Sequence, residues 1–364
     1  MSKIDVVNRQ VTPKGAMNAL RAAFAVRRPV FMWGPPGVGK SDIIHQLGNE
    51  MNAAVIDIRL SLWEPTDIKG IPFYDPASST MKWGSPSELP NEEFAAQYPN
   101  VILFLDEMNS AAPSVQAAAY QLILNRRVGQ YRLPDNVLIV AAGNRDGDKG
   151  VTYRMPAPLA NRFMHIEVKV DFDDWCEWAI SNKVHKDVVG YLTFSKGDLY
   201  DFDPKSGSRA FATPRSWSFV SELLYSKASD DVLLDLVAGT VGEGLALKFS
   251  AHRKIASKLP NPYDVLSGKI EKTDCTELSV QCSLAVGMCY EMAELMKKGE
   301  QIEPYFNNFI KFMMENFETE VTVMAVKQAL SQYNIVPDAA AMPAFIDFRQ
   351  KYGKYIAKCV SNRR

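Results

Sequence analysis

The sequence has little of what marks a disulfide framework or a metal centre. Its 364 residues include five cysteines and four histidines, and no two cysteines form a C-x-x-C pair. An odd number of scattered thiols argues for a reducing compartment and against a fold held by disulfides. Because the histidines show no ligand spacing with the cysteines, we expect no zinc site.

An excess of one charge and long apolar runs are also missing. The 41 basic residues balance 42 acidic ones, so the overall charge points neither to nucleic acid nor to an anionic membrane. Residues 1–12 are polar, and no later segment approaches the roughly 20 apolar residues that a membrane span needs. We therefore expect a soluble, cytoplasmic protein without membrane contact.

One segment carries a strong chemical signature. It fits the pattern G-x-x-x-x-G-K-[ST] at every fixed position and consists of Gly34, Pro35, Pro36, Gly37, Val38, Gly39, Lys40 and Ser41. Glycines let successive backbone NH groups turn toward a phosphate, and the N-terminus of a following helix adds partial positive charge. An apolar run before the segment and a helical pattern after it favour this phosphate-binding loop over a chance Gly/Pro turn. In such a loop Lys40 reaches the outer phosphates and Ser41 the magnesium ion.

Strands and helices alternate through the first part of the chain. Apolar runs predict five strands, at residues 30–33, 54–60, 101–105, 137–141 and 165–170. Helical patterns cover residues 12–26, the stretch after residue 40, and residues 113–125. Continuously apolar strands that alternate with helices are typical of a parallel sheet covered on both faces. We predict an α/β nucleotide-binding core with a five-stranded parallel sheet over residues 1–170.

The remainder of the chain changes character. Beyond residue 170 the apolar periodicity becomes helical and strand-like runs are scarce. We predict an all-α lid over residues 171–262 and a helical C-terminal extension over residues 263–364.

A Pro-rich segment, residues 61–90, interrupts the predicted core. It carries Trp63, Phe73, Tyr74 and Trp83 among polar residues. A loop of this length in a compact domain is usually functional or disordered. Its aromatic side chains could contact a partner or anchor the segment to the sheet.

Two adjacent acids, Asp106 and Glu107, follow the third predicted strand. Open α/β sheets bind ligands at the carboxyl ends of their strands. Asp106 is placed to hold magnesium, directly or through water, and Glu107 to polarise the water that attacks the γ-phosphate. The alternative is a helix N-cap beside a solvated acid. The pair predicts hydrolysis as well as nucleotide binding.

These motifs together resemble the AAA+ ATPases and, within them, the MoxR-like branch related to magnesium chelatase. The resemblance covers about residues 12–224 and rests on segments 34–41, 106–113, 141–144, 159–163 and 213–217, in the family's order and spacing. Residues 67–70 also look like the MoxR segment that inserts a small hairpin. The resemblance implies ATP and Mg²⁺ as cofactors and a homo-oligomeric, hexameric ring.

The resemblance also implies two nucleotide sensors. Asn144 corresponds to the sensor that orients the attacking water with Glu107, and an amide can donate to phosphate while accepting from water. Arg215 corresponds to a lid arginine that reaches the γ-phosphate of its own subunit. A turn residue and an ordinary exposed arginine are the respective alternatives.

A third implied residue is Arg162, the finger that enters the site of a neighbouring subunit. A guanidinium offers charge and a bidentate fork to a transferring phosphoryl group. A surface salt bridge is the alternative, and Arg154 and Arg145 compete for the same role.

The leading hypothesis is a MoxR-like chaperone, a ring ATPase that remodels or activates a protein partner. In that branch the partner is often a von Willebrand A type protein, and the inserted hairpin faces the pore or the partner. The alternative is a nucleic-acid translocase or restriction-type NTPase, for which the basic segment 126–132 is short. A P-loop kinase would not need Asn144, Arg162 and Arg215 together, and no complete guanine-reading N-K-x-D pattern is present, so ATP is preferred over GTP.

Overall fold

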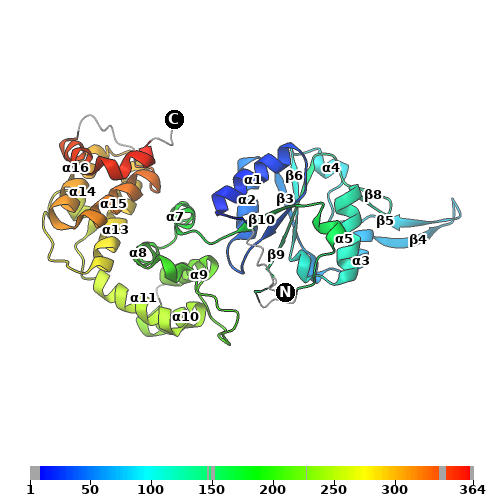
Figure 1. Cartoon of the computed structure of the whole chain (residues 1–364), viewed down its shortest axis with the longest axis horizontal. Helices are drawn as coiled ribbons and strands as arrows, with labels where there is room; N and C mark the ends of the chain where they lie inside the picture. The colour runs from blue at the N-terminus through cyan, green and yellow to red at the C-terminus, as the bar shows by residue number, and fades with distance from the viewer. Residues whose placement is uncertain (1–8, 146, 149–151, 227, 336–341, 361–364) are drawn as a thin grey trace, which may run out of the picture. The chain divides into compact units, whose positions relative to one another are not determined.

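The computed structural model describes residues 9–145, 147–148, 152–226, 228–335 and 342–360, with side chains up to residue 354 (Figure 1). Most of the polar N-terminal stretch, residues 1–8, therefore lies outside the described residues. The chain divides into two compact units, Met1–Asp171 and Phe172–Arg364.

A parallel sheet of six strands forms the centre of the first unit. Its order is β1 (Gln10–Val11), β10 (Met164–Val168), β2 (Val30–Trp33), β9 (Val137–Gly143), β6 (Val101–Asp106) and β3 (Ala54–Arg59). The predicted count of five strands was wrong, because β1 also pairs in parallel with Glu167 and Val168 of β10. Two residues are too short to produce a recognisable apolar pattern. The other strands begin and end within two residues of their predicted bounds.

Helices cover both faces of the sheet because successive strand residues point to opposite sides. On one face α1 (Pro13–Ala25) and α2 (Lys40–Glu50) pack against a cluster that contains Ile102 and Phe104 of β6. On the other face α5 (Pro113–Asn125) packs against Leu103 and Leu105 of the same strand. The predicted doubly covered α/β core is confirmed.

Short elements complete the first unit. They are α3 (Pro65–Lys69), α4 (Glu92–Ala95), α6 (Ala157–Ala160), the 3₁₀ turns η1 (Leu60–Leu62) and η2 (Met108–Ser110), and two antiparallel hairpins, β4 (Ile71–Asp75) with β5 (Thr80–Gly84) and β7 (Arg127–Val128) with β8 (Tyr131–Arg132). The β4–β5 hairpin extends away from the sheet in Figure 1. Gly70 precedes it with a φ of 82°, and a Cβ there would lie 1.8 Å from the Gly84 carbonyl oxygen, so the hairpin requires glycine at this position.

The second unit is helical. Its elements are α7 (Phe172–Ser181), α8 (Lys186–Phe194), η3 (Lys196–Leu199), α9 (Pro214–Tyr225), α10 (Asp230–Val241), α11 (Glu243–Ala256), α12 (Pro262–Leu266), α13 (Leu278–Lys297), α14 (Glu303–Asn316), α15 (Thr319–Ser331) and α16 (Pro343–Val360). An isolated bridge between Asp201 and Ala212 is the only β pairing in its described part.

Helices from both predicted parts of this unit pack together. A Cβ at Gly190 of α8 would lie 2.6 Å from Ser283 Oγ of α13, and the same hydroxyl lies 2.7 Å from His252 Nε2 of α11. The division into lid and extension at residue 262 stays a prediction. Among the helices that the structure describes, none combines the length and apolarity of a membrane span.

Candidate nucleotide site

The predicted phosphate-binding loop connects β2 to α2 at the carboxyl edge of the sheet. Gly37 and Gly39 have φ angles of 71° and 92°, a backbone conformation that favours glycine. Gly34 is confined as well, because a Cβ there would lie 3.2 Å from both the Val168 carbonyl oxygen and Val38 Cγ1. Helix α2 starts directly after the loop, and its N-cap, Gly39, supplies no side-chain cap. This geometry suits a phosphate, which backbone NH groups and the helix N-terminus would hold.

Lys40 contacts the predicted sensor. Its Nζ donates to the carbonyl oxygens of Gly34 at 2.9 Å and Pro35 at 3.3 Å, and to Oδ1 of Asn144 at 3.1 Å. Asn144 reaches this position because β9 pairs with β2, with Gly143 opposite Trp33. The structure therefore brings the loop lysine and the sensor amide together.

Ser41 and Asp106 also meet. Ser41 Oγ donates to Asp106 Oδ2 at 3.3 Å, and Asp106 is the last residue of β6. A hydroxyl and a carboxylate are oxygen ligands of the kind that Mg²⁺ prefers. Burial raises the pKa of the nearby Asp57 carboxyl, and the negative charge of Asp106 raises it further, against His45, which lowers it. The donor set and the concentration of negative charge fit a divalent cation.

Glu107 has an unusual backbone conformation. Its φ is 54°, in the left-handed region that non-glycine residues rarely occupy, and its NH donates to Asp106 Oδ1 at 2.8 Å. Ser61 Oγ, from η1 directly after β3, donates to Glu107 Oε2. Ser61 belongs to none of the motifs predicted from the sequence. Its position directly after the predicted buried strand 54–60 was the feature of the sequence that could have indicated a role, because residues that follow such strands reach the ligand-binding edge of the sheet.

Asn109 is a second residue without a predicted role. It is 2% exposed, and its Nδ2 donates to the backbone carbonyl of Asn144 at 2.8 Å. Its Oδ1 is buried and accepts no hydrogen bond within the described part of the chain. A Cβ at Gly143 would lie 2.1 Å from that oxygen. Asn109 thus holds the backbone from which the Asn144 side chain projects. In the sequence, the feature that could have indicated this role is its place in the motif segment 106–113.

The three candidate finger arginines lie in different surroundings. Arg145 Nη2 lies 2.9 Å from Asp148 Oδ1, and its Nη1 lies 3.7 Å from Glu167 Oε1. Arg154 is exposed and follows Tyr153, whose NH donates to the Asn109 carbonyl at 2.7 Å. Arg162 is exposed and precedes β10, at the amino edge.

Arg215 belongs to the second unit. It lies exposed in the first turn of α9, after Thr213 and Pro214. The Thr213 hydroxyl accepts from the Ser216 NH at 3.0 Å, and the Ser216 hydroxyl accepts from the Thr213 NH at 2.7 Å. This reciprocal capping box fixes the start of the helix. The sensor role of Arg215 stays a prediction.

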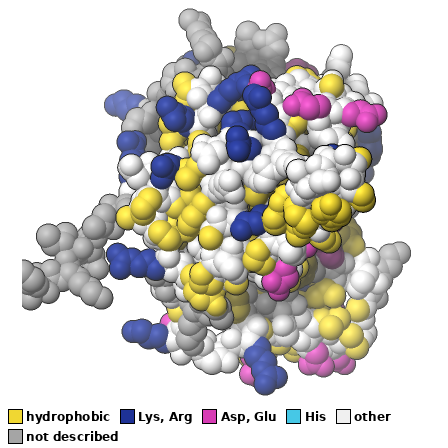
Figure 2. Space-filling view, turned by 90° about the vertical axis from the view of Figure 1, so that its right-hand side faces the viewer, with side chains coloured by type: hydrophobic (Ala, Val, Ile, Leu, Met, Phe, Trp, Pro, Cys, Tyr) yellow, Lys and Arg dark blue, Asp and Glu magenta, His cyan; other side chains and the backbone are white. Residues whose placement is uncertain are grey.

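The aromatic residues of the insertion divide into two groups. Trp63 packs against the core cluster on the α5 face, and Trp83 lies beside Gly129. Phe73 and Tyr74 are 50% and 59% exposed on the hairpin, as is Met81 at 57%. Figure 2 shows exposed hydrophobic side chains together with Lys and Arg on the side of the molecule where the hairpin lies in Figure 1. The tryptophans anchor the segment, and the hairpin presents an exposed apolar surface.

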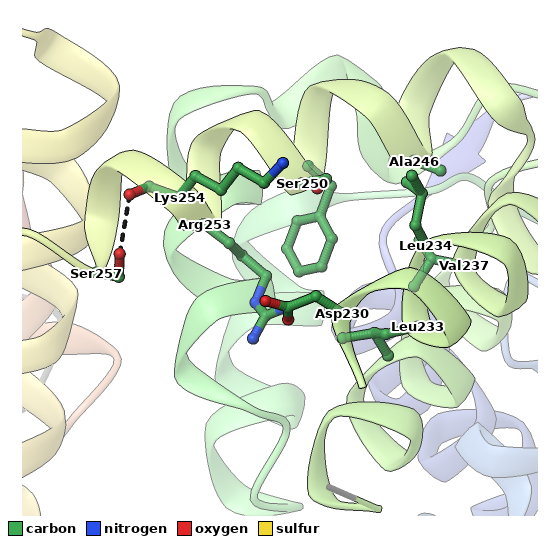
Figure 3. Close-up of a pocket in the computed structure, with 10 residues that line it drawn as sticks. Asp230, Leu233, Leu234, Val237, Ala246, Ser250, Arg253, Lys254 and Ser257 are labelled. Carbon is green, nitrogen blue, oxygen red and sulfur yellow. Dashed lines mark hydrogen bonds and ion pairs between the residues drawn. The ribbon is translucent and has the colours of Figure 1, made fainter. Parts of the chain in front are cut away.

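A cavity of about 120 Å³ in the second unit contains none of the predicted site residues (Figure 3). It lies between α10 and α11, where Asp230 Oδ1 and Arg253 Nη1 are 3.9 Å apart. Arg253 Nε also lies 3.1 Å from Asp187 Oδ2. Because two carboxylates compensate the charge of Arg253, we interpret this ion pair as stabilising the packing of the helices.

Comparison with known proteins agrees with the fold. Residues 30–170 match the model of the family described as ATPase family associated with various cellular activities (AAA). With the P-loop and the parallel sheet, this match shows that the first unit has a P-loop AAA+ α/β fold.

Individual relatives are distant. The chain is 27% identical over 190 residues to midasin from Giardia intestinalis, a match that spans 50% of this chain and 4% of that protein. Among solved structures it is similar to the RuvB Holliday junction branch migration motor of Thermotoga maritima, at 16% identity and a TM-score of 0.36, covering 83% of this chain and 86% of that chain. It is also similar to NtrX from Brucella abortus in complex with ADP, at 15% identity and a TM-score of 0.38, covering 84% of this chain and 70% of that chain.

Proposed function

We propose that this chain is a ring-forming, MoxR-like ATPase that couples ATP binding and hydrolysis to remodelling or activating a protein partner. The observation that carries the proposal is the contact between Lys40 and Asn144 beside the acids Asp106 and Glu107. One edge of the sheet thus carries all the parts that the proposal needs. They are a cation for phosphate (Lys40), an oxygen donor pair for Mg²⁺ (Ser41 and Asp106), a candidate base (Glu107) and a polar candidate sensor (Asn144).

Each of these residues has a distinct task in the proposed site. The loop NH groups and Lys40 would hold the phosphates of ATP, with Lys40 exchanging contacts to carbonyl oxygens for phosphate oxygens. Ser41 and Asp106 would hold Mg²⁺, which neutralises charge on the β- and γ-phosphates when bound. Glu107 would accept a proton from water after its carboxylate leaves Ser61, and Asn144 would orient that water.

Arg162 supports the ring part of the proposal. It lies at the amino edge of the sheet, at the end opposite the P-loop of its own chain, which supports a role at the nucleotide of a neighbouring subunit. We propose a hexamer with Arg162 acting in trans and Arg215 acting as the second sensor within its own chain. In such a ring each active site is completed by the next subunit.

The hairpin supports a protein partner. Tyr74 and Met81 pair across the two strands and form an exposed apolar surface on one face of the hairpin, whereas the exposed Phe73 lies on the other face. Exposed apolar surfaces mark interaction sites. We propose that this surface contacts the remodelled protein, a von Willebrand A type protein in the MoxR-like interpretation. The described cysteines are unpaired thiols, which supports a cytoplasmic, reducing location.

The second hairpin supplies the observation for the alternative, a nucleic-acid translocase. Arg127 of β7 pairs directly with Arg132 of β8, so the hairpin presents two basic side chains, of which Arg132 lies 3.5 Å from Asp135 Oδ1. Each strand of this hairpin has two residues, which limits the nucleic acid it can contact.

ATPase rates test the proposal and separate it from the alternative. We expect ATP hydrolysis by the unaltered chain that is unaffected by single-stranded or duplex DNA and is stimulated by the protein partner. Stimulation of tenfold or more by DNA would favour the translocase. The absence of ATP binding would overturn both functions.

A further inference from the structure

A second cavity of the second unit lies along one face of α15. It has a volume of about 360 Å³, and α7, α8 and η3 supply its opposite wall. The α15 residues that line it recur every three or four positions, at Glu320, Val323, Met324, Lys327 and Gln328, so they share one face of the helix. We call this site the α15 cavity. Its volume is in the range of sites that bind small molecules.

A buried amide forms part of the wall of the α15 cavity. The side chain of Gln328 is 4% exposed, and its Nε2 donates to Thr193 Oγ1 at 3.1 Å. Thr193 also lines the cavity, and its own hydroxyl donates to the Val189 carbonyl at 2.8 Å. The single hydroxyl hydrogen is thus used within α8, so Thr193 Oγ1 can only accept from Gln328. This hydrogen bond fixes the orientation of the amide, with Nε2 toward Thr193 and Oε1 away from it.

Oε1 of Gln328 has no donor. It is buried and accepts no hydrogen bond from any residue that the structure describes. A buried acceptor that has left water without gaining a donor destabilises the fold. The amide oxygen of Gln332, which lines the same cavity, accepts from Cys176 Sγ at 3.2 Å. Gln328 therefore differs from its neighbour in needing a donor from outside the described chain.

Met324 lies next to this amide. The two residues are four positions apart on α15 and are neighbours on its surface. Methionine side chains are flexible and adapt to what packs against them, so Met324 can move to give a ligand access to Oε1. Val323 and Phe172 add further apolar surface to the lining. A ligand with an apolar body would remove this surface from water, which is favourable.

The charges around the α15 cavity cancel. The charged residues of its described lining are two acids, Asp173 and Glu320, and two lysines, Lys196 and Lys327. Lys196 Nζ lies 3.6 Å from Asp173 Oδ1 and 4.8 Å from the centre of the Phe172 ring. A balanced lining gives no electrostatic preference for an anion or a cation. The cavity therefore favours an uncharged ligand.

We propose that the α15 cavity binds a small, uncharged molecule with an apolar body and an N–H donor, and that Gln328 Oε1 accepts this donor. The apolar body would cover Phe172, Val323 and Met324. A hydrocarbon would leave Oε1 without a donor, and a phosphate would bring a further acceptor to it. All residues of the cavity belong to the second unit, so the inference does not depend on the nucleotide site.

Indole and indene test the proposal without any substitution. The two molecules are uncharged and have nearly the same shape, but only indole carries an N–H donor. We expect indole to shift the methyl resonance of Met324 in NMR spectra of the full chain, with Met324→Leu identifying that resonance. In titrations followed by this resonance, indole should bind at least about fivefold more tightly than indene, the effect of one neutral hydrogen bond.

Gln328→Leu provides a second readout. Leucine fills a similar space but has no acceptor, so the preference for indole over indene should disappear. The urea midpoint should be unchanged or higher, because the substitution removes the unpartnered oxygen while Thr193 keeps its hydrogen bond to Val189. Gln301→Leu, at an exposed position of the same unit, is the matched control and should keep both the preference and the midpoint.

Three outcomes would overturn the proposal. The first is the absence of a shift at Met324 with indole. The second is equal affinity of the unaltered chain for indole and indene. The third is a preference for indole that persists in Gln328→Leu, because the donor would then be bound by another group.

Discussion

Nζ of Lys40 donates a hydrogen bond of 3.1 Å to Oδ1 of Asn144, although the two residues are 104 positions apart. The pairing of β2 with β9 produces this contact, because it places the ends of both strands side by side. The loop lysine and the predicted sensor amide are therefore in direct contact.

Replacing Lys40 should reduce nucleotide binding. Lys40→Ala removes the cation that would meet the outer phosphates, and a hydrogen bond to a charged group contributes about 1.5–3 kcal/mol. We expect ATP affinity to fall about 10- to 100-fold, measured by titration calorimetry. Lys272→Ala, at an exposed position of the second unit, is the control and should bind as the unaltered chain does. Equal affinities for the two variants would contradict the assignment of the loop.

Replacing Asn144 should separate binding from hydrolysis. The amide of Asn144 would orient the attacking water, a contribution needed chiefly in the transition state. We expect Asn144→Ala to lower kcat about 100-fold, the order of effect when one positioned polar group is lost. ATP affinity should change less than fivefold. A loss of affinity as large as the loss of turnover would show that Asn144 acts as a binding residue only.

Asn109 should act through Asn144. Asn109→Ala removes the hydrogen bond to the Asn144 carbonyl and also the buried, unpartnered Oδ1. Because these two effects oppose each other, we expect the free energy of unfolding to change by less than about 1 kcal/mol. Turnover should fall several-fold while the KM for ATP is preserved. Asn125→Ala, at the exposed end of α5, should leave both constants unchanged, and a similar result for Asn109→Ala would exclude a positioning role.

Gly143 should tolerate no side chain. A Cβ at this position would lie 2.1 Å from Asn109 Oδ1 and 3.0 Å from Phe31 Cζ, and overpacking of this kind destabilises by about 1–3 kcal/mol. We expect Gly143→Ala to lower the urea midpoint accordingly. Gly147→Ala has no atom within 4 Å of the added carbon and serves as the control. Equal urea midpoints for the two variants would contradict the prediction and would mean that the Asn109 side chain can move away from the added methyl group.

The second unit should lose stability in mild acid. Burial lowers the pKa of His185 and His252, although Asp187 opposes the shift at both and Glu277 also opposes it at His252. Above a pH of about 6.5 both histidines are neutral in the folded and unfolded chains, whereas below it the unfolded chain binds protons more readily. Stability should therefore fall as the pH decreases from about 7 to 5.5. His185 Nδ1 also caps the start of α8 by accepting a hydrogen bond of 3.2 Å from the Asp187 NH. A protonated Nδ1 can no longer accept this hydrogen bond.

Urea unfolding at several pH values measures this effect. The variant His252→Gln cannot take up the proton, so its stability should depend less on pH over the same interval. The comparison is between slopes, since the substitution also changes the contact with Ser283. A slope equal to that of the unaltered chain would exclude His252 as a contributor.

The sequence predicted the core of the fold because its signals are local. Continuous apolar runs identified the strands that became β2, β3, β6, β9 and β10, and the glycine spacing identified the loop. The two-residue strand β1 escaped because its position depends on pairing with Glu167 and Val168 rather than on its own pattern.

Two contacts of the candidate site could not be predicted for a similar reason. Ser61 reaches Glu107 across neighbouring strands, and Asn109 reaches the Asn144 backbone across a buried turn. Such contacts depend on strand order, which apolar periodicity does not specify.

Glu107→Gln provides the most direct test of the central claim, that these residues form a site for ATP hydrolysis. The amide keeps the shape of the side chain but cannot accept the proton of the attacking water, a contribution of about 10²- to 10⁴-fold. We predict that single-turnover measurements will show ATP bound with unaltered affinity and hydrolysed at least 100-fold more slowly than by the parental chain. Hydrolysis at the parental rate would contradict the account.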